Sequence, residues 1–305
     1  MLLKTRLTYS TTMPRTFKEK LLSDDFLVTA EITPPKGTDL SEALGDAEIL
    51  SGLADALNVT DNQRAVMRMS PLAVSKALLD KGHEVIMQLT CRDRNRLALQ
   101  SDVLAAYSLG VRNISVMSGD HTTKGDHPRA RPVFDIDSVQ LLGAIRKMKE
   151  GFDLSGNEIG GMPDLTVGAV SNTDLSKPMQ LLKLRKKIKM GAEFLQTQAV
   201  YDTGQFQAFM EYIIDMDVPV IAGVIPLKSA KMARFMNDNI PGISVPPQMI
   251  KRMENAEDPA WEGLSICAQT IRELKGICRG VHVMPIGSHS RTPELLEMAG
   301  IRKGN

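Results

Sequence analysis

Residues 84–120 read EVIMQLTCRDRNRLALQSDVLAAYSLGVRNISVMSGD, and this stretch decides the fold class. It opens with the apolar run Glu84–Thr90, closes with a second such run at Asn113–Ser118, and holds a longer amphipathic segment, Asn95–Leu109, between them. Two short apolar runs that flank a helical pattern are typical of a strand–helix–strand unit with parallel strands. Gly110 follows the helical segment, at the position where a left-handed residue commonly ends a helix.

The same alternation continues along the chain in both directions. The further strand-like runs are Phe26–Thr33, Ala54–Thr60, Leu165–Val170, Phe194–Val200, Val218–Ile225 and Val281–Ile286. The further helical patterns are Leu40–Leu53, Ser70–Lys81, Ile136–Lys149, Ser176–Met190, Gln205–Asp215, Ser229–Asn237 and Pro259–Gly276. About eight such units close naturally into a barrel, whereas an open doubly wound sheet usually carries a G-x-G-x-x-G turn after its first strand, and none follows here.

The pattern therefore predicts an α/β protein with one (β/α)₈ TIM barrel. The long connection from Ala230 to Gly280 predicts extra helices between the seventh and eighth strands rather than a linker between domains. We expect an N-terminal arm at residues 1–20, which is polar and threonine-rich, and a catalytic domain at residues 21–305.

Composition narrows the classes of partner. The 305 residues carry 37 basic and 36 acidic side chains, so no strong field favours nucleic acid or an anionic membrane, and a small-molecule partner is expected. No apolar run approaches the roughly 20 residues of a transmembrane helix. The cysteines Cys91, Cys267 and Cys278 lie far apart, which predicts neither disulfides nor a zinc motif and fits the cytoplasm. Homo-oligomerisation is left open.

Barrel enzymes place their chemistry at the carboxyl ends of the strands, so polar residues there are the candidates. Glu31 ends the first strand inside an apolar run. Burial raises the pKa of a carboxyl group and makes a general acid, although a buried carboxylate can also be the partner of a buried Arg or Lys. Asp120 follows Gly119 at the end of the fourth strand, where glycine lets the backbone approach a ligand closely.

Amide and hydroxyl side chains end the third and sixth strands. The period of two places Gln88 and Thr90 on one face, as candidates for the barrel mouth. It also places Gln196 and Gln198 on one face, and two neutral amides there suit recognition of a heterocycle with mixed donors and acceptors. An amide ladder between strands is the alternative for the pair on the sixth strand. The cluster Arg92–Arg94 is either a set of ion pairs with Asp93 as helix cap or part of a ligand site.

Two other groups of polar residues are better explained as solvent-exposed than as functional sites. His121 and His127, beside Asp120 and Asp126, lie on a loop without the spacing of a metal site, so no metal is expected. The basic run at residues 185–189 is typical of a solvated helix face, from which one residue could turn to a phosphate.

These strand ends resemble those of the methylenetetrahydrofolate reductases over about Phe26–Ile301. The marks are the E-x-x-P-P element Glu31–Pro35, Leu89-Thr90-Cys91, Gly119-Asp120, and Thr197-Gln198 followed by Tyr201-Asp202. The resemblance implies an FAD-binding barrel that converts 5,10-methylenetetrahydrofolate to 5-methyltetrahydrofolate in one-carbon and methionine metabolism.

The resemblance also implies roles for particular residues. Glu31 becomes the general acid that helps to open the five-membered ring to a 5-iminium cation, and Asp120 the carboxylate that stabilises this cation. Gln198 becomes the amide that holds the folate, with Gln196 and Tyr201 as further substrate-binding residues. The implied FAD-binding residues are Thr60, Gln88, Thr90, Ser118, Gly119, Asp120, Ala169, Asn172 and Lys187.

Several positions depart from the family pattern. Gln88 replaces a histidine, Ser118 an arginine, and Asn172 lies in an altered stretch after the fifth strand, which predicts altered contacts to FAD. The segments Pro226–Ala230 and Met284–Gly287 lack the aromatic and arginine residues that form the nicotinamide site in NADH-using relatives. The resemblance therefore implies either NAD(P)H or an electron-delivering protein subunit as the electron donor.

Two other classes of function compete with a reductase. A lyase or aldolase needs a Schiff-base lysine or a glycine-rich phosphate loop, and neither is evident. A non-catalytic barrel scaffold fits the departures but leaves Glu31, Asp120 and Gln198 unexplained.

Overall fold

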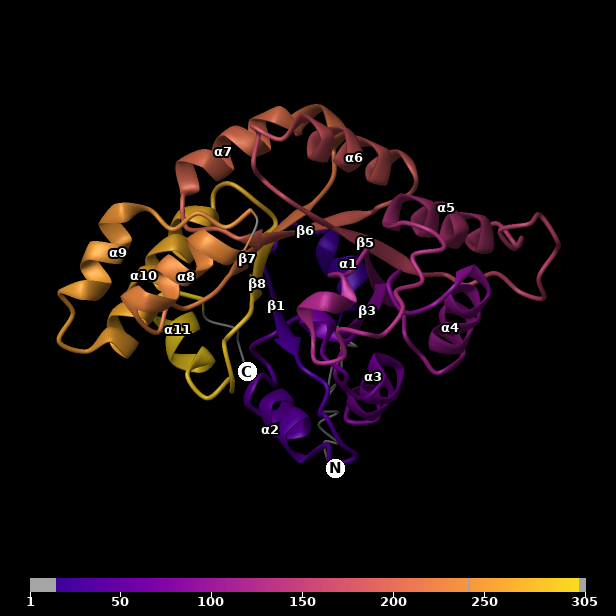
Figure 1. Ribbon diagram of the computed structural model, residues 1–305, viewed down its shortest axis with the longest axis horizontal. Helices are drawn as coiled ribbons and strands as arrows, with labels where there is room; N and C mark the ends of the chain where they lie inside the picture. Colours follow the sequence, from indigo (N-terminus) through magenta and orange to yellow (C-terminus); the bar gives the residue numbers. More distant parts are fainter. Residues whose placement is uncertain (1–14, 241, 302–305) are drawn as a thin grey trace, which may run out of the picture.

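The computed structural model describes residues 15–240 and 242–301. Parallel strands alternate with helices in this part of the chain and close into a barrel in sequence order, β1 to β8 (Figure 1). The strands are β1 (Leu27–Ile32), β2 (Ala56–Val59), β3 (Val85–Thr90), β4 (Asn113–Met117), β5 (Thr166–Ser171), β6 (Phe194–Ala199), β7 (Val220–Val224) and β8 (Gly280–Val283).

The helices form a layer around the strands (Figure 1). They are α1 (Phe17–Leu21), α2 (Ser41–Ile49), α3 (Pro71–Leu79), α4 (Arg96–Ser108), α5 (Ser138–Lys149), α6 (Pro178–Lys189), α7 (Thr203–Tyr212), α8 (Ala230–Asn239), α9 (Pro247–Glu254), α10 (Pro259–Leu274) and α11 (Thr292–Met298). Short 3-10 turns, η1 (Gln63–Ala65), η2 (Thr122–Lys124) and η3 (Ile214–Met216), lie in the connections. The (β/α)₈ prediction is confirmed, and so are the extra helices between β7 and β8.

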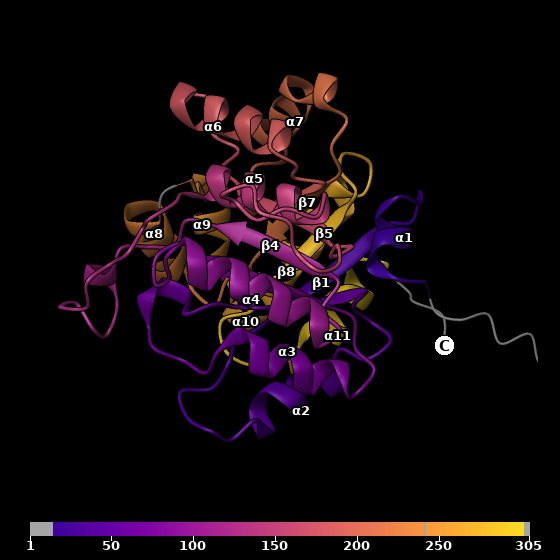
Figure 2. The same ribbon diagram turned by 90° about the vertical axis from the view of Figure 1, so that its right-hand side faces the viewer.

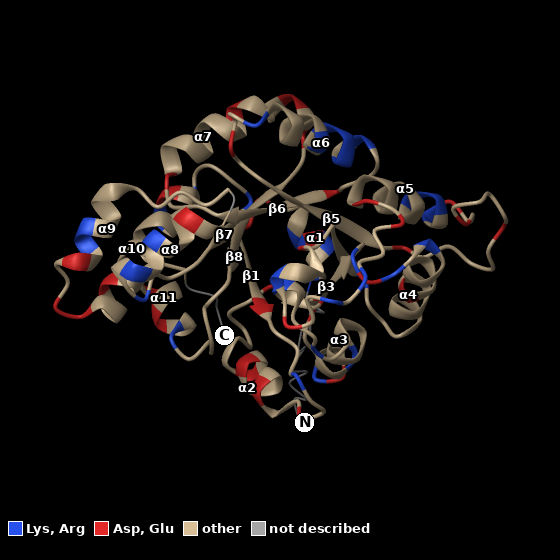
Figure 3. Ribbon diagram, viewed as in Figure 1, with Lys and Arg blue, Asp and Glu red and all other residues tan. Residues whose placement is uncertain are grey.

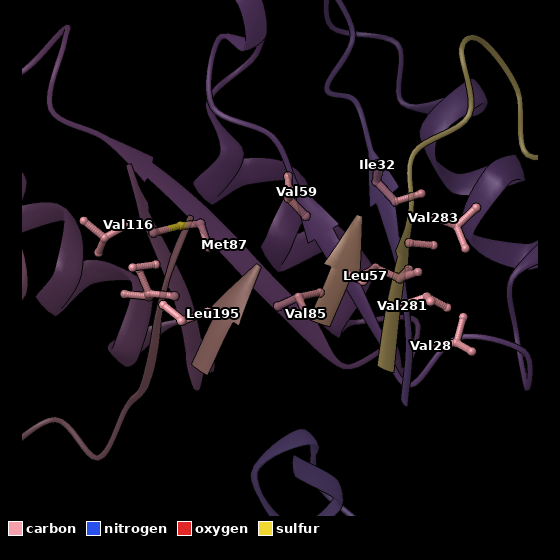
Figure 4. Close-up of a cluster of buried hydrophobic side chains, with 14 of the residues drawn as sticks. Val28, Ile32, Leu57, Val59, Val85, Met87, Val116, Leu195, Val281 and Val283 are labelled. Atoms are coloured by element: carbon pink, nitrogen blue, oxygen red, sulfur yellow. The ribbon is translucent and has the colours of Figure 1, made fainter. Parts of the chain in front are cut away.

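The outward face of the strands and the inner faces of the helices form the main apolar core. Val28, Leu57, Met87, Val116 and Leu195 belong to it (Figure 4). These residues alternate along their strands with residues that face the barrel interior, because successive side chains of a strand point to opposite sides. The outer core therefore does not fill the inside of the barrel, which a separate set of side chains has to fill.

That separate set lies at the amino-terminal end of the barrel, where α1 closes it like a plug. Phe17 and Leu21 of α1 pack with Leu27, Ala56, Ile86, Phe194 and Ile221, which come from strands on different sides of the barrel and can meet only inside it. The rings of Phe17 and Phe194 meet edge to face with centroids 5.3 Å apart. Gly168 makes this possible, because a Cβ there would lie 2.2 Å from the Phe194 ring.

Helix α1 corrects one predicted boundary. The arm was expected to extend to residue 20, but α1 begins at Phe17 and is fixed by a capping box in which Thr16 and Glu19 bond each other's backbone N–H groups. Residues 17–20 therefore belong to the barrel, since they form one helix with Leu21 that buries Phe17 and Leu21 in it. Residues 1–14 of the predicted arm lie outside the described residues.

A third apolar cluster holds the extra helices against the barrel. Tyr201, Leu227, Ala233, Met253 and Ile266 pack together there, and they join α8, α9 and α10 to the segments that follow β6 and β7. Figure 2 shows α1 at one end of the strands and α8, with the long β4–α5 connection, at the other. The two ends therefore differ in character: one is sealed by apolar side chains and the other is surrounded by loops.

Candidate active site

Polar side chains gather inside the barrel above the apolar plug. Asn58 of β2 donates from Nδ2 to Oε1 of Gln196 on β6 at 2.8 Å, and because these strands are four apart in the closed sheet, this bond crosses the interior. Thr29 and His282, adjacent in register on β1 and β8, bond each other at 3.0 Å. Buried atoms of Asn58, Gln196 and Ser115 lack partners among the described residues, so the layer has hydrogen-bonding capacity left.

Glu31 lies above this layer at the end of β1. Its side chain is partly buried, and its Oε1 accepts a hydrogen bond of 2.8 Å from Nε2 of Gln63. Burial raises the pKa of Glu31 to about 7, against the smaller opposing effect of the Gln63 bond. Among the described residues Glu31 forms no ion pair, so the alternative of a buried Arg or Lys partner does not apply. The group can hold a proton near neutral pH.

Asp120 lies at the same end of the barrel, after β4. Its side chain is exposed, with the nearest cation, Lys124 Nζ, at 3.3 Å. Its backbone oxygen accepts a 3.2 Å bond from Nη1 of Arg92. Gly119 has a φ of +85°, and a Cβ there would press on Thr90 and Arg92, so glycine is required for this turn. The carboxylate is thus held on a fixed backbone while remaining accessible.

Arg92 is nearly fully buried and joins three strand ends. It bonds Asp93 through both Nε and Nη2, and its Nη2 also donates to the backbone oxygen of Asn62 at 3.1 Å. Arg94 pairs with Asp61 and Asp102, so the ion-pair reading of this cluster is confirmed. The expected cap role of Asp93 is wrong.

The cap of α4 belongs instead to Asn95. Its side chain accepts hydrogen bonds of 3.1 Å from the N–H groups of both Leu97 and Ala98. Asp93 lies two residues before the cap position, because α4 begins at Arg96, and its carboxylate pairs with Arg92 instead. The sequence therefore indicated the charged cluster Arg92–Arg94, but which of its residues pair with which partners depends on the folded structure.

The two glutamines of β6 do not form a simple pair. The register of β6 against β7 shifts between Gln196 and Ala199, so the strict alternation that placed Gln196 and Gln198 on one face is interrupted. Gln196 is buried and bonded to Asn58, whereas Gln198 is exposed. Gln198 is therefore the one of the two with a surface that a ligand can reach.

Tyr201, the second residue after β6, is buried inside the protein. Its side chain is buried in the cluster beneath α8, and its O–H donates to the backbone oxygen of Ile225 at 2.9 Å. Burial also raises the pKa of Tyr201 well above its ordinary value. The residue supports the segment after β7 in this structure.

Three residues near Glu31 did not stand out in the sequence. Gln63 bonds its carboxyl group, and Nε2 of His289 lies 2.6 Å from its backbone oxygen. Burial lowers the pKa of His282 to about 3 and also lowers the pKa of His289, so both are neutral at neutral pH. Two of them could have been identified from the sequence: Gln63 because it follows a strand end, and His282 because the period of two on β8 directs it into the barrel. No local pattern marks His289.

A sequence profile described as methylenetetrahydrofolate reductase matches residues 16–300. This chain belongs to the methylenetetrahydrofolate reductase family. The 5,10-methylenetetrahydrofolate reductase of Salmonella typhimurium is 25% identical over 259 residues, which cover 82% of this chain and 77% of that protein. The enzyme of the same name from Escherichia coli is 25% identical over 76% of this chain and 75% of its own length.

Solved structures agree on the fold. An uncharacterised protein from Clostridium thermocellum, described as binding two copies of 5-methyl-5,6,7,8-tetrahydrofolic acid, superposes with a TM-score of 0.64 at 19% identity and covers 94% of this chain and 97% of that chain. A 2,3-dimethylmalate lyase superposes with a TM-score of 0.51 at 11% identity, covering 93% and 81%. At these identities the likeness concerns the barrel alone.

Residues that the family resemblance assigns to a flavin lie at the ends of β2 to β5. Thr60 is buried, and its Oγ1 has no hydrogen-bond partner among the described residues. Gln88 is also buried, whereas Thr90 donates from Oγ1 to Asp61 at 2.8 Å. Ser118 Oγ accepts a 3.4 Å bond from Lys183. An unsatisfied hydroxyl, a close-approach glycine and a nearby lysine fit a polar, phosphate-bearing cofactor at this edge.

The other residues that the resemblance assigns to the flavin already pack against or bond other parts of the protein. The side chain of Ala169 lies in the outer core, and that of Asn172 packs against Gly242 of the α8–α9 connection. A basic band lies along α6 (Figure 3), and within this helix Lys187 is buried while Arg185 is exposed. Its Nζ donates to the backbone oxygen of Val170 at 2.6 Å, and burial, with repulsion from Lys183, lowers the pKa of Lys187 to about 8.

Neither a metal centre nor a membrane span is found within residues 15–240 and 242–301. No group of three or more His, Cys, Asp or Glu side chains there could hold a metal ion. No helix in the same residues is long and apolar enough to cross a bilayer.

Proposed function

We propose that this protein reduces 5,10-methylenetetrahydrofolate to 5-methyltetrahydrofolate with FAD as its bound cofactor. The family match over residues 16–300 supports the reaction. The observation that carries the proposal is the carboxyl group of Glu31, which stands at the open end of the barrel with a pKa raised to about 7. A general acid is most effective when its pKa lies near the working pH.

Glu31 acts as the acid that opens the five-membered ring of the substrate. Its proton passes to the ring nitrogen that leaves, and the one-carbon unit remains on the other nitrogen as an iminium cation. The polar layer of Asn58 and Gln196 beneath it keeps the site hydrogen-bonded without adding a competing charge. A positioned acid of this kind contributes about 10²–10⁴-fold to the rate.

Asp120 stabilises the cation by its negative charge, and Gln198 holds the heterocycle. The carboxylate of Asp120 is exposed, and its backbone is held in place by Arg92 and by the turn at Gly119. The exposed amide of Gln198 can both donate and accept. Bound folate in the Clostridium thermocellum protein, which shares the fold, supports a folate as ligand.

The flavin supplies hydride when it is bound, and this chain supplies the residues that hold it. Thr60, Gln88, Thr90, Ser118 and Gly119 at the ends of β2 to β4 are the holding residues we propose. Lys183, beside Ser118, is suited to an anionic part of the cofactor.

The electron donor is NAD(P)H or a partner protein subunit. A relative from Arabidopsis thaliana named methylenetetrahydrofolate reductase (NADH) 1 is 26% identical, but over 52% of this chain and 28% of that protein. The segments after β7 and β8 lack an aromatic residue, and Phe235, half exposed on α8, is the candidate that could stack on a nicotinamide. We favour the partner subunit, because stacking is missing from both segments.

One set of anaerobic assays tests the proposal. The purified protein is mixed with FAD, the flavin is photoreduced, and its reoxidation by methylenetetrahydrofolate is followed by stopped flow. Rapid reoxidation in the wild type and its loss in Glu31→Gln are expected. Flavin that fails to bind, or reduced flavin that the folate does not reoxidise, contradicts the proposed function. Rapid, saturable flavin reduction by micromolar NADH contradicts the partner-subunit donor.

A further inference from the structure

The carboxyl group of Glu31 is in contact with an amide that the family resemblance does not assign. Gln63 of η1 donates from Nε2 to Glu31 Oε1 at 2.8 Å across the ends of β2 and β1. The carbonyl oxygen of a carboxylic acid is a better acceptor than its hydroxyl oxygen, so this contact favours placing the acidic proton on the other oxygen, Oε2. The contact therefore selects which oxygen of the acid carries the proton.

The turn that carries Gln63 has an unusual backbone. Asn62, Arg64 and Ala65 have φ angles of 44°, 57° and 58°, in the left-handed region that residues other than glycine seldom adopt. Backbone strain of this kind persists only where surrounding contacts impose it, and it gathers at functional sites. Gln63 is thus flanked on both sides by left-handed residues.

Contacts with two neighbouring loops, and one within the same β2–α3 connection, hold this conformation. The backbone oxygen of Asn62 accepts a bond from buried Arg92, and its Oδ1 accepts the N–H of Arg68 at 2.9 Å. On the other side of the turn, the β4–α5 connection lies so close that a Cβ on Gly125 would fall 1.7 Å from the backbone oxygen of Ala65. The turn is therefore clamped between the ends of β3 and β4.

The charged and titratable groups around Glu31 bond partners other than its carboxyl group. His289 meets its backbone oxygen, and His282 bonds Thr29 one layer below. Arg68 donates to the backbone oxygen of Pro34, and Lys36 pairs with an aspartate of the β4–α5 connection. Gln63 is the side chain that bonds the carboxyl group itself among the described residues.

We propose that Gln63 is a positioning residue for the acid, whose amide is fixed by the clamped turn so that the protonated oxygen of Glu31 faces the substrate. This inference rests on the proposed function, in which Glu31 donates the proton. An N–H donor favours the ionised carboxylate, so Gln63 also opposes the effect of burial on the pKa of Glu31.

Gln63→Met tests the contact directly, because methionine has a similar size but donates no hydrogen bond. Infrared difference spectra across pH report the carboxyl band of Glu31, assigned by its loss in Glu31→Gln. We expect the midpoint of this band to move to higher pH in Gln63→Met. Gln63→Glu is the second variant and moves it in the same direction through like-charge repulsion. Gln207→Met is the matched control, since Gln207 also donates to a glutamate, Glu211, but on α7.

The pH dependence of kcat/KM for folate reduction tests the role. We expect the activity of the wild type to fall as pH rises through about 7, because the pKa of Glu31 is raised to about 7 by burial. In Gln63→Met we expect the low-pH plateau to fall about tenfold, part of the 10²–10⁴-fold that a positioned acid provides, and the alkaline limb to move to higher pH. A lower plateau with an unmoved limb indicates a merely structural residue and overturns the proposal.

The two hypotheses fail separately. If Glu31→Gln turns over as fast as the wild type, the acid assignment in the proposed function fails, and the kinetic role of Gln63 with it. If Glu31→Gln is inactive while Gln63→Met titrates and turns over like the wild type, only the inference about Gln63 is overturned.

Discussion

Replacing Glu31 by glutamine is expected to stabilise the folded protein at alkaline pH while removing the acid. Burial raises the pKa of Glu31 from an ordinary value of 4.5 to about 7, so the folded state binds this proton more tightly than the unfolded chain. Stability is then greatest below pH 4.5 and falls as pH rises to about 7, because folding must bury a charge that the unfolded chain keeps in water. Glutamine has the same shape and no charge to bury.

The size of the effect follows from the two pKa values. Their difference of about 2.5 corresponds to about 3.4 kcal/mol at about 1.36 kcal/mol per pH unit. Most of this cost develops between pH 5 and pH 8.5, and partial exposure of the side chain reduces it. We therefore expect the stability gained by Glu31→Gln to be larger at pH 8.5 than at pH 5 by about 1–2.5 kcal/mol.

Urea unfolding of both proteins at the two pH values measures this difference. Glu257→Gln, a change of an exposed glutamate in the α9–α10 connection, is the matched control and should show no such pH dependence. If the wild type and Glu31→Gln differ by the same free energy of unfolding at both pH values, Glu31 does not titrate with a raised pKa. The physical basis of its assignment as an acid would then be refuted.

Three further outcomes are expected. Asp120→Asn removes the charge opposite the cation and should slow folate reduction by about 10²-fold, measured in single turnovers of flavin-loaded protein; an unchanged rate removes Asp120 from the mechanism. Gln198→Ala should weaken folate binding by about 1 kcal/mol in a calorimetric titration, and loss of FAD with unchanged folate affinity would show that the assignment is wrong. Phe17→Ala should lower the free energy of unfolding by about 3–5 kcal/mol, because its ring is fully buried in the plug of the barrel. Leu22→Ala, one turn on and 75% exposed, is its control, and equal effects of the two changes would contradict the plug.

The sequence by itself determined the order of strands and helices and the end of the barrel at which chemistry occurs. Each strand has a recognisable local sequence pattern, as in Glu84–Thr90. Eight such strand–helix units in one chain favour a closed barrel. Glu31 and Asp120 could be selected because strand ends are local features too. Their roles came from a resemblance of motifs, which local physics does not supply.

Tertiary structure alone decided which of these groups meet and in what state of charge. Asn58 and Gln196 bond across the barrel, 138 residues apart, and Gln63 reaches Glu31 from another strand end. The bulge on β6 separates Gln196 from Gln198, although period-two alternation joined them. Contacts between distant residues and the burial that shifts the pKa of Glu31 arise only when the barrel closes, because both depend on neighbours that closure brings together and not on adjacent sequence.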